Sequence, residues 1–218
     1  MKKTLFIWDF HGVLEKDNEK AVIEISNKVL SQQGYTERFT EQDNERLYGL
    51  KWYQYFERLS PRFSSQECLD LQAECFELTK NDPSILIRYI KTNDNVIEVL
   101  SKIDESDGHQ IVVSNTRQQD LIWFLNAINA KQFFYGENII GVNAHQTHET
   151  KLYAVQDYLK DKNFDKIIVI GDSESDLELG RAIGAITYFY KHPGKQHEAT
   201  QNADYLIDDL REVLKELS

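Results

Sequence analysis

The fold of this chain follows from one stretch near its start, Thr4-Leu5-Phe6-Ile7-Trp8-Asp9-Phe10-His11-Gly12-Val13-Leu14. This stretch opens with a short apolar run that stops at a charge and a glycine, which is typical of a strand buried on both faces. Similar apolar runs recur at residues 111–113, 139–142, 167–170, 186–190 and 205–207. Helical patterns separate or follow them, at residues 121–128, 151–159, 177–183 and 210–217. Strands that alternate with helices of this length predict an α/β fold built on a mostly parallel, doubly wound sheet.

Residues 17–93 break this alternation, because they contain several helical signals and no convincing strand. Ser64 precedes Glu67 by three residues, a capping-box pattern that marks the start of a helix. The sequence therefore predicts two parts. Residues 1–16 and 94–218 form a core, and residues 17–93 form an all-helical insertion.

Composition narrows the possible partners. Lys and Arg number 25 against 36 Asp and Glu, and the formal net charge of −11 argues against a broad surface for nucleic acid or anionic membrane. The apolar run at residues 5–8 is too short for a signal peptide or a membrane span. Cys68 and Cys75 are seven residues apart in one predicted helix, too far for a disulfide between them, as expected in a reducing compartment. We therefore expect a cytoplasmic protein without nucleic acid or membrane partners.

Polar residues gather where the predicted strands end. Ligands of an open parallel sheet bind beyond the carboxyl ends of its strands. The polar residues that follow these strands, or start the helix before one, are Asp9, Ser114, Asn115, Lys151, Asp172 and Asp176. Three carboxylates this close repel one another by roughly several kcal/mol at an effective dielectric of about 20, so they coexist most readily around a cation. Oxygen ligands favour Mg²⁺, while a lysine and helix N-terminal amides suit a phosphate.

Taken in order, these motifs resemble those of the haloacid dehalogenase superfamily of hydrolases, and in particular its phosphoglycolate-phosphatase-like members. The residues that carry the resemblance are Asp9-x-x-Gly12-x-Leu14, Ile111-Val112-Val113-Ser114-Asn115, Lys151 and Gly171-Asp172-Ser173-x-x-Asp176. The resemblance covers nearly the whole chain, because the helical insertion after the first motif matches that superfamily's cap. It implies a Rossmann-like catalytic core with an α-helical cap domain.

The resemblance also implies a role for each residue. Asp9 would be the nucleophile that forms an aspartyl-phosphate, and Ser114, Asn115 and Lys151 would bind the phosphoryl group. The implied ligands of Mg²⁺ are Asp9, His11 through its backbone carbonyl, Asp172 and Asp176. The implied activity is Mg²⁺-dependent hydrolysis of small phosphorylated metabolites.

One position departs from the superfamily's pattern. Most of its phosphatases carry a second Asp two residues after the nucleophile, as general acid and base, where this chain has His11. Either the His11 side chain takes over that catalytic role, since histidine titrates near neutrality, or only its carbonyl matters and turnover is slower. A third interpretation is poor hydrolysis, in a phosphotransferase or a catalytically impaired metabolite-binding protein.

Phosphonate-cleaving relatives form a further alternative. They use a cap lysine in a Gly-Leu-x-Lys-like context to form a Schiff base with the substrate. The stretch Gly49-Leu50-Lys51 is one residue short of that spacing. Such a lysine must be desolvated to act as a nucleophile, and a solvated lysine at a helix start is the simpler interpretation of Lys51.

Overall fold

The computed structural model describes residues 3–43, 47, 50–106, 108–142, 150–192 and 202–217. The chain divides into two compact units, one formed by Met1–Lys16 with Lys91–Ser218 and the other by Asp17–Ile90. We call them the core unit and the helical unit.

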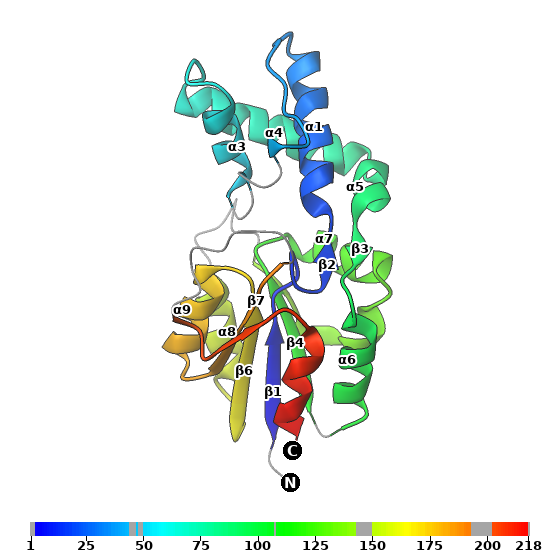
Figure 1. Ribbon diagram of the computed structural model, residues 1–218, viewed down its shortest axis with the longest axis vertical. Coiled ribbons are helices and arrows are strands. Elements are labelled where there is room, and N and C mark those ends of the chain that lie inside the picture. Colours follow the sequence, from blue (N-terminus) through cyan, green and yellow to red (C-terminus); the bar gives the residue numbers. More distant parts are fainter. Residues whose placement is uncertain are drawn as a thin grey trace. The chain divides into compact units, whose positions relative to one another are not determined.

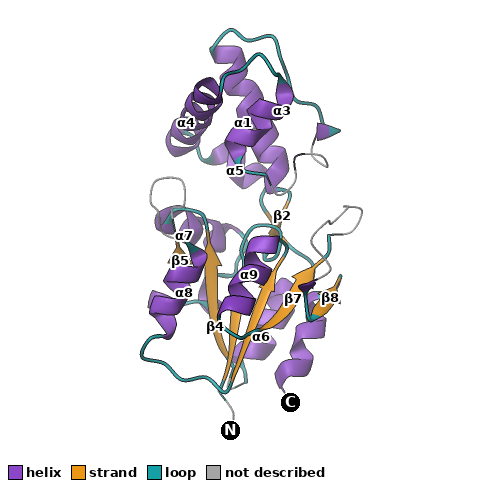
Figure 2. Ribbon diagram, turned by 90° about the vertical axis from the view of Figure 1, so that its left-hand side faces the viewer, coloured by secondary structure: helices purple, strands orange, loops and turns teal. Residues whose placement is uncertain are grey.

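The core unit is built on a six-stranded sheet with the strand order β5-β4-β1-β6-β7-β8, in which every pair of neighbours is parallel (Figure 2). Its strands are β1 (Thr4–Trp8), β4 (His109–Ser114), β5 (Ile139–Gly141), β6 (Lys166–Gly171), β7 (Ile186–Tyr190) and β8 (Tyr205–Ile207). The chain runs from β1 outward to β5 on one side and then from β6 outward to β8 on the other. The prediction of a doubly wound parallel α/β sheet is confirmed, and its topological switch point lies between β1 and β6, where such sheets bind ligands.

Helices cover both faces of this sheet (Figure 1). The helices of the core unit are α6 (Val96–Asp104), α7 (Gln118–Ala127), α8 (Lys151–Leu159), α9 (Glu174–Ala182) and the 3₁₀ helices η1 (Lys131–Phe133), η2 (Gly136–Asn138) and η4 (Leu210–Leu217). On one face, Ile7 of β1 shares a hydrophobic cluster with Leu179 of α9. On the other, Trp8 donates to Gln110, which donates to the backbone oxygen of Leu100 in α6. Because both faces are buried, β1 is apolar without alternation.

The helix predicted at the end of the chain is present, and Leu210–Leu217 forms it as a 3₁₀ helix. Its buried residues Leu210 and Val213 are three positions apart, which matches three residues per turn. In the described part of the chain, none of the helices is both long and apolar enough to cross a membrane.

The helical unit contains α1 (Asn18–Gln32), α3 (Trp52–Leu59), α4 (Ser65–Asn81) and α5 (Ser84–Tyr89) (Figure 2). It has its own hydrophobic core, which includes Tyr55, Phe56 and both cysteines. The start of α4 follows the sequence signal, because the Ser64 side chain accepts a hydrogen bond from the backbone N–H of Glu67. Among its described residues there is no strand.

A short two-stranded ribbon pairs the segment that precedes the helical unit with the segment that follows it. β2 (Glu15–Lys16) pairs antiparallel with β3 (Lys91–Thr92), so that Glu15 lies opposite Thr92. Asn93 also belongs to the core unit, where its side-chain amide donates to the backbone oxygen of Val13. The boundary therefore falls after Ile90, three residues earlier than the sequence suggested, because strand pairing holds this segment to the core.

Candidate active site

The first loop of the site begins where β1 ends. The N–H of Asp9 donates to the backbone oxygen of Ile170 at 2.9 Å, which continues the pairing with β6 for one more residue. The chain then turns, with Gly12 at a φ of 82°, a conformation that side chains disfavour. The N–H of Glu15 returns to the backbone oxygen of Phe10 at 3.2 Å, which closes the turn and starts β2.

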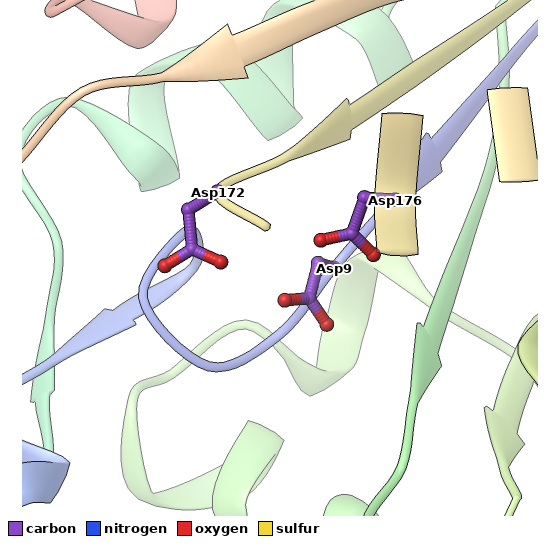
Figure 3. Close-up of side chains that lie close together, drawn as sticks. All are labelled: Asp9, Asp172 and Asp176. Carbon is purple, nitrogen blue, oxygen red and sulfur yellow. The ribbon is translucent and has the colours of Figure 1, made fainter. Parts of the chain in front are cut away.

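Three carboxylates meet at the carboxyl ends of β1 and β6 (Figure 3). One oxygen from each of Asp9, Asp172 and Asp176 lies within 4.8 Å of the others. Asp9 and Asp176 are buried, with 9% and 1% of their surfaces exposed. A Cβ atom at position 171 would lie 2.2 Å from the Cβ of Asp176, so Gly171 is required for α9 to approach the strand this closely.

Lys151 joins two of these acids. Its Nζ donates to Asp9 Oδ1 at 2.6 Å and to Asp176 Oδ1 at 2.7 Å, and its side chain is buried. The Thr150 hydroxyl caps α8 by accepting a hydrogen bond from the N–H of Tyr153, so the helix begins at Lys151 and holds it in place. The predicted residues Asp9 and Asp176 are thus bridged by hydrogen bonds from Lys151.

The electrostatics of the cluster follow from its burial. Burial raises the pKa of Asp9 to about 7, an effect that Lys151 opposes and the charges of Asp176 and Asp172 strengthen. Burial works against the charge on Lys151, but Asp176 and Asp9 raise its pKa above the ordinary value. The lysine is therefore cationic at neutral pH. A metal ion among the carboxylates would lower the pKa of Asp9 and keep it ionised.

Hydroxyl groups lie at the end of the neighbouring strand, β4. Ser114 is its last residue and is buried, and Asn115, which follows, is exposed. The Ser114 hydroxyl donates to Thr116 Oγ1 at 3.1 Å, and the N–H of Thr116 donates to Ser114 Oγ at 3.3 Å. Thr116 links Ser114 to the loop after β1, because its hydroxyl also bonds the ring of His11.

The His11 ring is held from several sides. Its Nδ1 lies 2.8 Å from Glu15 Oε1, and its Nε2 lies 2.9 Å from Thr116 Oγ1. The rings of Phe10 and Phe124 contact it edge-on, with centroids 5.0 and 5.6 Å away. Partial burial opposes a charge on the imidazole, but the hydrogen bond and charge of Glu15 raise the pKa of His11 above its ordinary value.

The structure adds Glu15 and His192 to the residues singled out from the sequence. His192 Nε2 lies 3.0 Å from Asp172 Oδ2, and both side chains are about nine-tenths buried. The residue stands two positions after β7, so the same search of strand ends, extended to that strand, would have found it. The only sequence signal for Glu15 is its position four residues after His11, next to the apolar pair at positions 13 and 14.

The donor set fits a hard divalent cation, because it consists of clustered carboxylate oxygens with buried surroundings. Asp176 accepts hydrogen bonds on both oxygens, Oδ1 from Lys151 and Oδ2 from the Ser173 hydroxyl at 2.6 Å. That arrangement suits a carboxylate that reaches a cation through water. Asp9 and Asp172 are better placed to ligate it directly.

A parallel α/β core with clustered carboxylates and a buried lysine at its carboxyl edge is typical of hydrolytic and group-transfer enzymes. The sequence model of the haloacid dehalogenase-like hydrolases matches residues 6–190 of the chain. The chain belongs to this family. A comparison with curated proteins gives no match.

Solved structures share the fold over nearly the full length. A provisionally named phosphatase from Clostridium difficile has a TM-score of 0.82 at 16% identity, with 100% of both chains covered. A haloacid dehalogenase-like hydrolase from Streptococcus pneumoniae has a TM-score of 0.78 at 16% identity, with 99% of this chain and 98% of the other covered. A hydrolase of the family from Deinococcus radiodurans, solved with bound phosphate and sodium, has a TM-score of 0.65 at 17% identity, with 98% and 95% covered.

Proposed function

We propose that this hydrolase cleaves phosphate monoesters of small metabolites in a Mg²⁺-dependent reaction that passes through a phosphorylated Asp9. The observation that carries the proposal is the position of Asp9. It lies at the switch point of the sheet, hydrogen-bonded to Lys151 and within 4.8 Å of carboxylate oxygens of Asp172 and Asp176. The phosphate bound to the Deinococcus radiodurans relative supports a phosphate-containing substrate.

The chain's own residues suit a two-step displacement. An Asp9 oxygen forms a bond to phosphorus while the bond from phosphorus to the ester oxygen breaks, and the leaving alcohol takes up a proton. Water then attacks the phosphorus of the aspartyl-phosphate, which releases phosphate and restores Asp9. Lys151 and the Ser114 hydroxyl would donate to the phosphoryl oxygens during both steps, with Asn115 at the rim.

Asp9 and Asp172 would hold Mg²⁺ directly, together with the backbone carbonyl of His11, and Asp176 would do so through water. When bound, the cation would neutralise phosphoryl oxygens and the mutual repulsion of the carboxylates. The buried lysine adds one further positive charge, so the site is suited to a dianionic group despite the overall net charge of −11.

We assign the proton of the leaving alcohol to the side chain of His11, whose Nε2 faces the hydroxyls at the end of β4. Protonation matters most for poor leaving groups. His11→Ala should therefore slow hydrolysis of an alkyl phosphate far more than hydrolysis of p-nitrophenyl phosphate. Equal losses for both esters would reduce the role of His11 to its backbone carbonyl.

We further propose that the helical unit, Asp17–Ile90, acts as a cap that excludes water and selects the leaving group. Cys68 and Cys75 are free and buried in this unit, and the cytoplasm remains the proposed location. Small phosphorylated metabolites, rather than nucleic acid or a membrane, remain the expected partners.

Phosphonate cleavage is the less favoured alternative. Lys51 is exposed at the start of α3, where its N–H donates to Gln54, whereas a Schiff-base lysine must be desolvated. Gly49, the other end of that sequence pattern, lies outside the described residues. A phosphotransferase or an impaired binding protein would share the acidic site, and only turnover separates these alternatives from hydrolysis.

The deciding experiment is phosphate release from p-nitrophenyl phosphate with Mg²⁺ and with EDTA, for the natural chain and for Asp9→Asn. Asp157→Asn on α8 is the matched control, because Asp157 is an exposed aspartate outside the site. We expect Mg²⁺-dependent release that Asp9→Asn abolishes and the control retains. Normal activity of Asp9→Asn would exclude the phospho-Asp9 mechanism, and an inactive natural chain would favour a phosphotransfer or binding role.

A further inference from the structure

Glu15 is a buried acid that the proposed mechanism leaves without a role. Only 1% of its surface is exposed. Its Oε1 accepts from His11, but its Oε2 is buried without a hydrogen-bond partner among the described residues. A buried carboxylate with an unsatisfied oxygen lowers stability, so its presence beside the site calls for a functional explanation.

The backbone holds Glu15 firmly in this position. Its N–H closes the turn onto Phe10, and its pairing with Thr92 anchors it in the β2–β3 ribbon. A bridge also joins the backbones of His11 and Glu15 directly. The carboxylate is therefore presented to the imidazole by a fixed frame rather than by a mobile side chain on the surface.

The opposite edge of the ring meets the hydroxyls at the end of β4. Nε2 bonds Thr116 Oγ1 at 2.9 Å, and Thr116 bonds the Ser114 hydroxyl at 3.1 Å. These contacts form one continuous chain from Glu15 through His11 and Thr116 to Ser114. The hydrogen bond made by one ring nitrogen of a histidine sets which face and which tautomer the other nitrogen presents.

We propose that Glu15 is a positioning residue that accepts the Nδ1–H of His11 and thereby aims Nε2 at the hydroxyls of Thr116 and Ser114. The inference rests on the proposed function for its effect on turnover, but not for the ring geometry itself. Without Glu15 the imidazole is free to rotate or to change tautomer, and the time it spends in the productive orientation falls.

Kinetics of a double-mutant cycle test this role. The variants are Glu15→Leu, which removes the acceptor at similar volume, His11→Ala, and both together, assayed on an alkyl phosphate. We expect Glu15→Leu to lower kcat about 10- to 100-fold and to leave KM unchanged, because proton transfer contributes about 100-fold or more to the rate. The decrease in kcat should not exceed the decrease that His11→Ala causes. In the His11→Ala background, Glu15→Leu should have no further effect. Glu15→Gln, which keeps an acceptor oxygen, should recover part of the lost kcat.

Stability provides a readout that separates positioning from a structural role. Glu15→Leu removes an unsatisfied buried oxygen together with one hydrogen bond to the partly exposed His11 ring, so its melting temperature should change little. The matched control is Glu216→Leu, because Glu216 accepts hydrogen bonds from Tyr188 and from Lys166, at the start of β6. That control should lose stability and keep kcat, the opposite pattern.

The tautomer of the His11 ring can be measured directly by ¹⁵N NMR of its side chain, at a pH where the imidazole is neutral. The spectrum of His11→Ala assigns the signals of this ring. We expect the Nδ1–H tautomer in the natural chain and its loss in Glu15→Leu. Additive kinetic effects, or an Nε2–H tautomer in the natural chain, would overturn the proposal. If the natural chain hydrolyses no phosphate ester, the proposed function fails while the NMR result still decides the positioning.

Discussion

Replacing Lys151 by methionine tests the electrostatic design of the site most directly. The substitution keeps the length and apolar stem of the side chain and removes its charge. In the natural chain Nζ lies 2.6 Å from Asp9 and 2.7 Å from Asp176, and all three side chains are buried. Lys151→Met therefore leaves two buried carboxylates facing each other without a counter-charge.

The magnitude follows from their separation. Two unit charges 4.8 Å apart, the outer limit for oxygens of this cluster, repel by about 3.5 kcal/mol at an effective dielectric of about 20. Removing one partner of a buried ion pair typically costs about 3–5 kcal/mol, which agrees with this figure. For a chain of this length, such a loss lowers the melting temperature by about 10 °C. The loss should be larger at pH 8 than at pH 5, because protonated carboxyl groups do not repel each other.

The assay is urea unfolding of Lys151→Met and of the natural chain at pH 5 and 8, with and without Mg²⁺. Lys102→Met is the control, because Lys102 forms an exposed pair with Glu98 on α6 and its removal should be near neutral. Mg²⁺ should stabilise the variant more than the natural chain, since it supplies the missing positive charge. A loss below about 1 kcal/mol at pH 8, or equal stabilisation of both proteins by Mg²⁺, would refute the electrostatic reasoning.

Further predictions concern the metal and the packing of the site. Because the pKa of Asp9 is about 7 without a cation, Mg²⁺ binding should release a proton, and the affinity measured by calorimetry should rise from pH 6 to pH 8 and be flat above. His192→Ala should weaken Mg²⁺ binding by about 10-fold or more, because it removes the hydrogen bond that orients Asp172; an unchanged dissociation constant would exclude that role. Gly171→Ala should displace Asp176, whose Cβ would lie 2.2 Å from the new methyl group, and lower both stability and Mg²⁺ affinity; a variant with the natural chain's affinity would contradict the close packing.

The sequence predicted the parts of the site that depend on strand ends. The carboxyl ends of parallel strands meet at one edge, so Asp9 and Asp172 had to be neighbours once β1 and β6 were identified. Lys151 followed from the start of the helix before β6, and the structure places its amine between Asp9 and Asp176. The proposed roles of these residues remain predictions, but their proximity could be anticipated from the order of strands and helices.

Other features depend on contacts that no local pattern encodes. The ribbon of β2 and β3 joins segments that are far apart in the sequence, since Glu15 and its partner Thr92 are 77 positions apart, and a strand of two residues carries almost no periodicity. The hydrogen bond between His11 and Thr116 could not be predicted from the sequence either, because Thr116 lies 105 positions away. The pairing of His192 with Asp172 bridges two strand ends and depends on β7 lying beside β6.

The charge balance of the cluster explains why proton and metal should compete for it. Three carboxylates and one lysine give the cluster a formal charge of −2 in a largely buried site, where the His192 ring pairs with Asp172. Burial and the neighbouring charges of Asp176 and Asp172 raise the pKa of Asp9 to about 7, so in the absence of a cation a proton on Asp9 lowers the negative charge of the cluster. A divalent cation would balance a formal charge of −2 and leave Asp9 ionised, as the proposed nucleophile must be. The same carboxylates that favour a bound proton on Asp9 therefore favour a divalent ion in its place. We expect phosphate to bind after the metal rather than before it, because the metal first offsets the negative charge of the carboxylates.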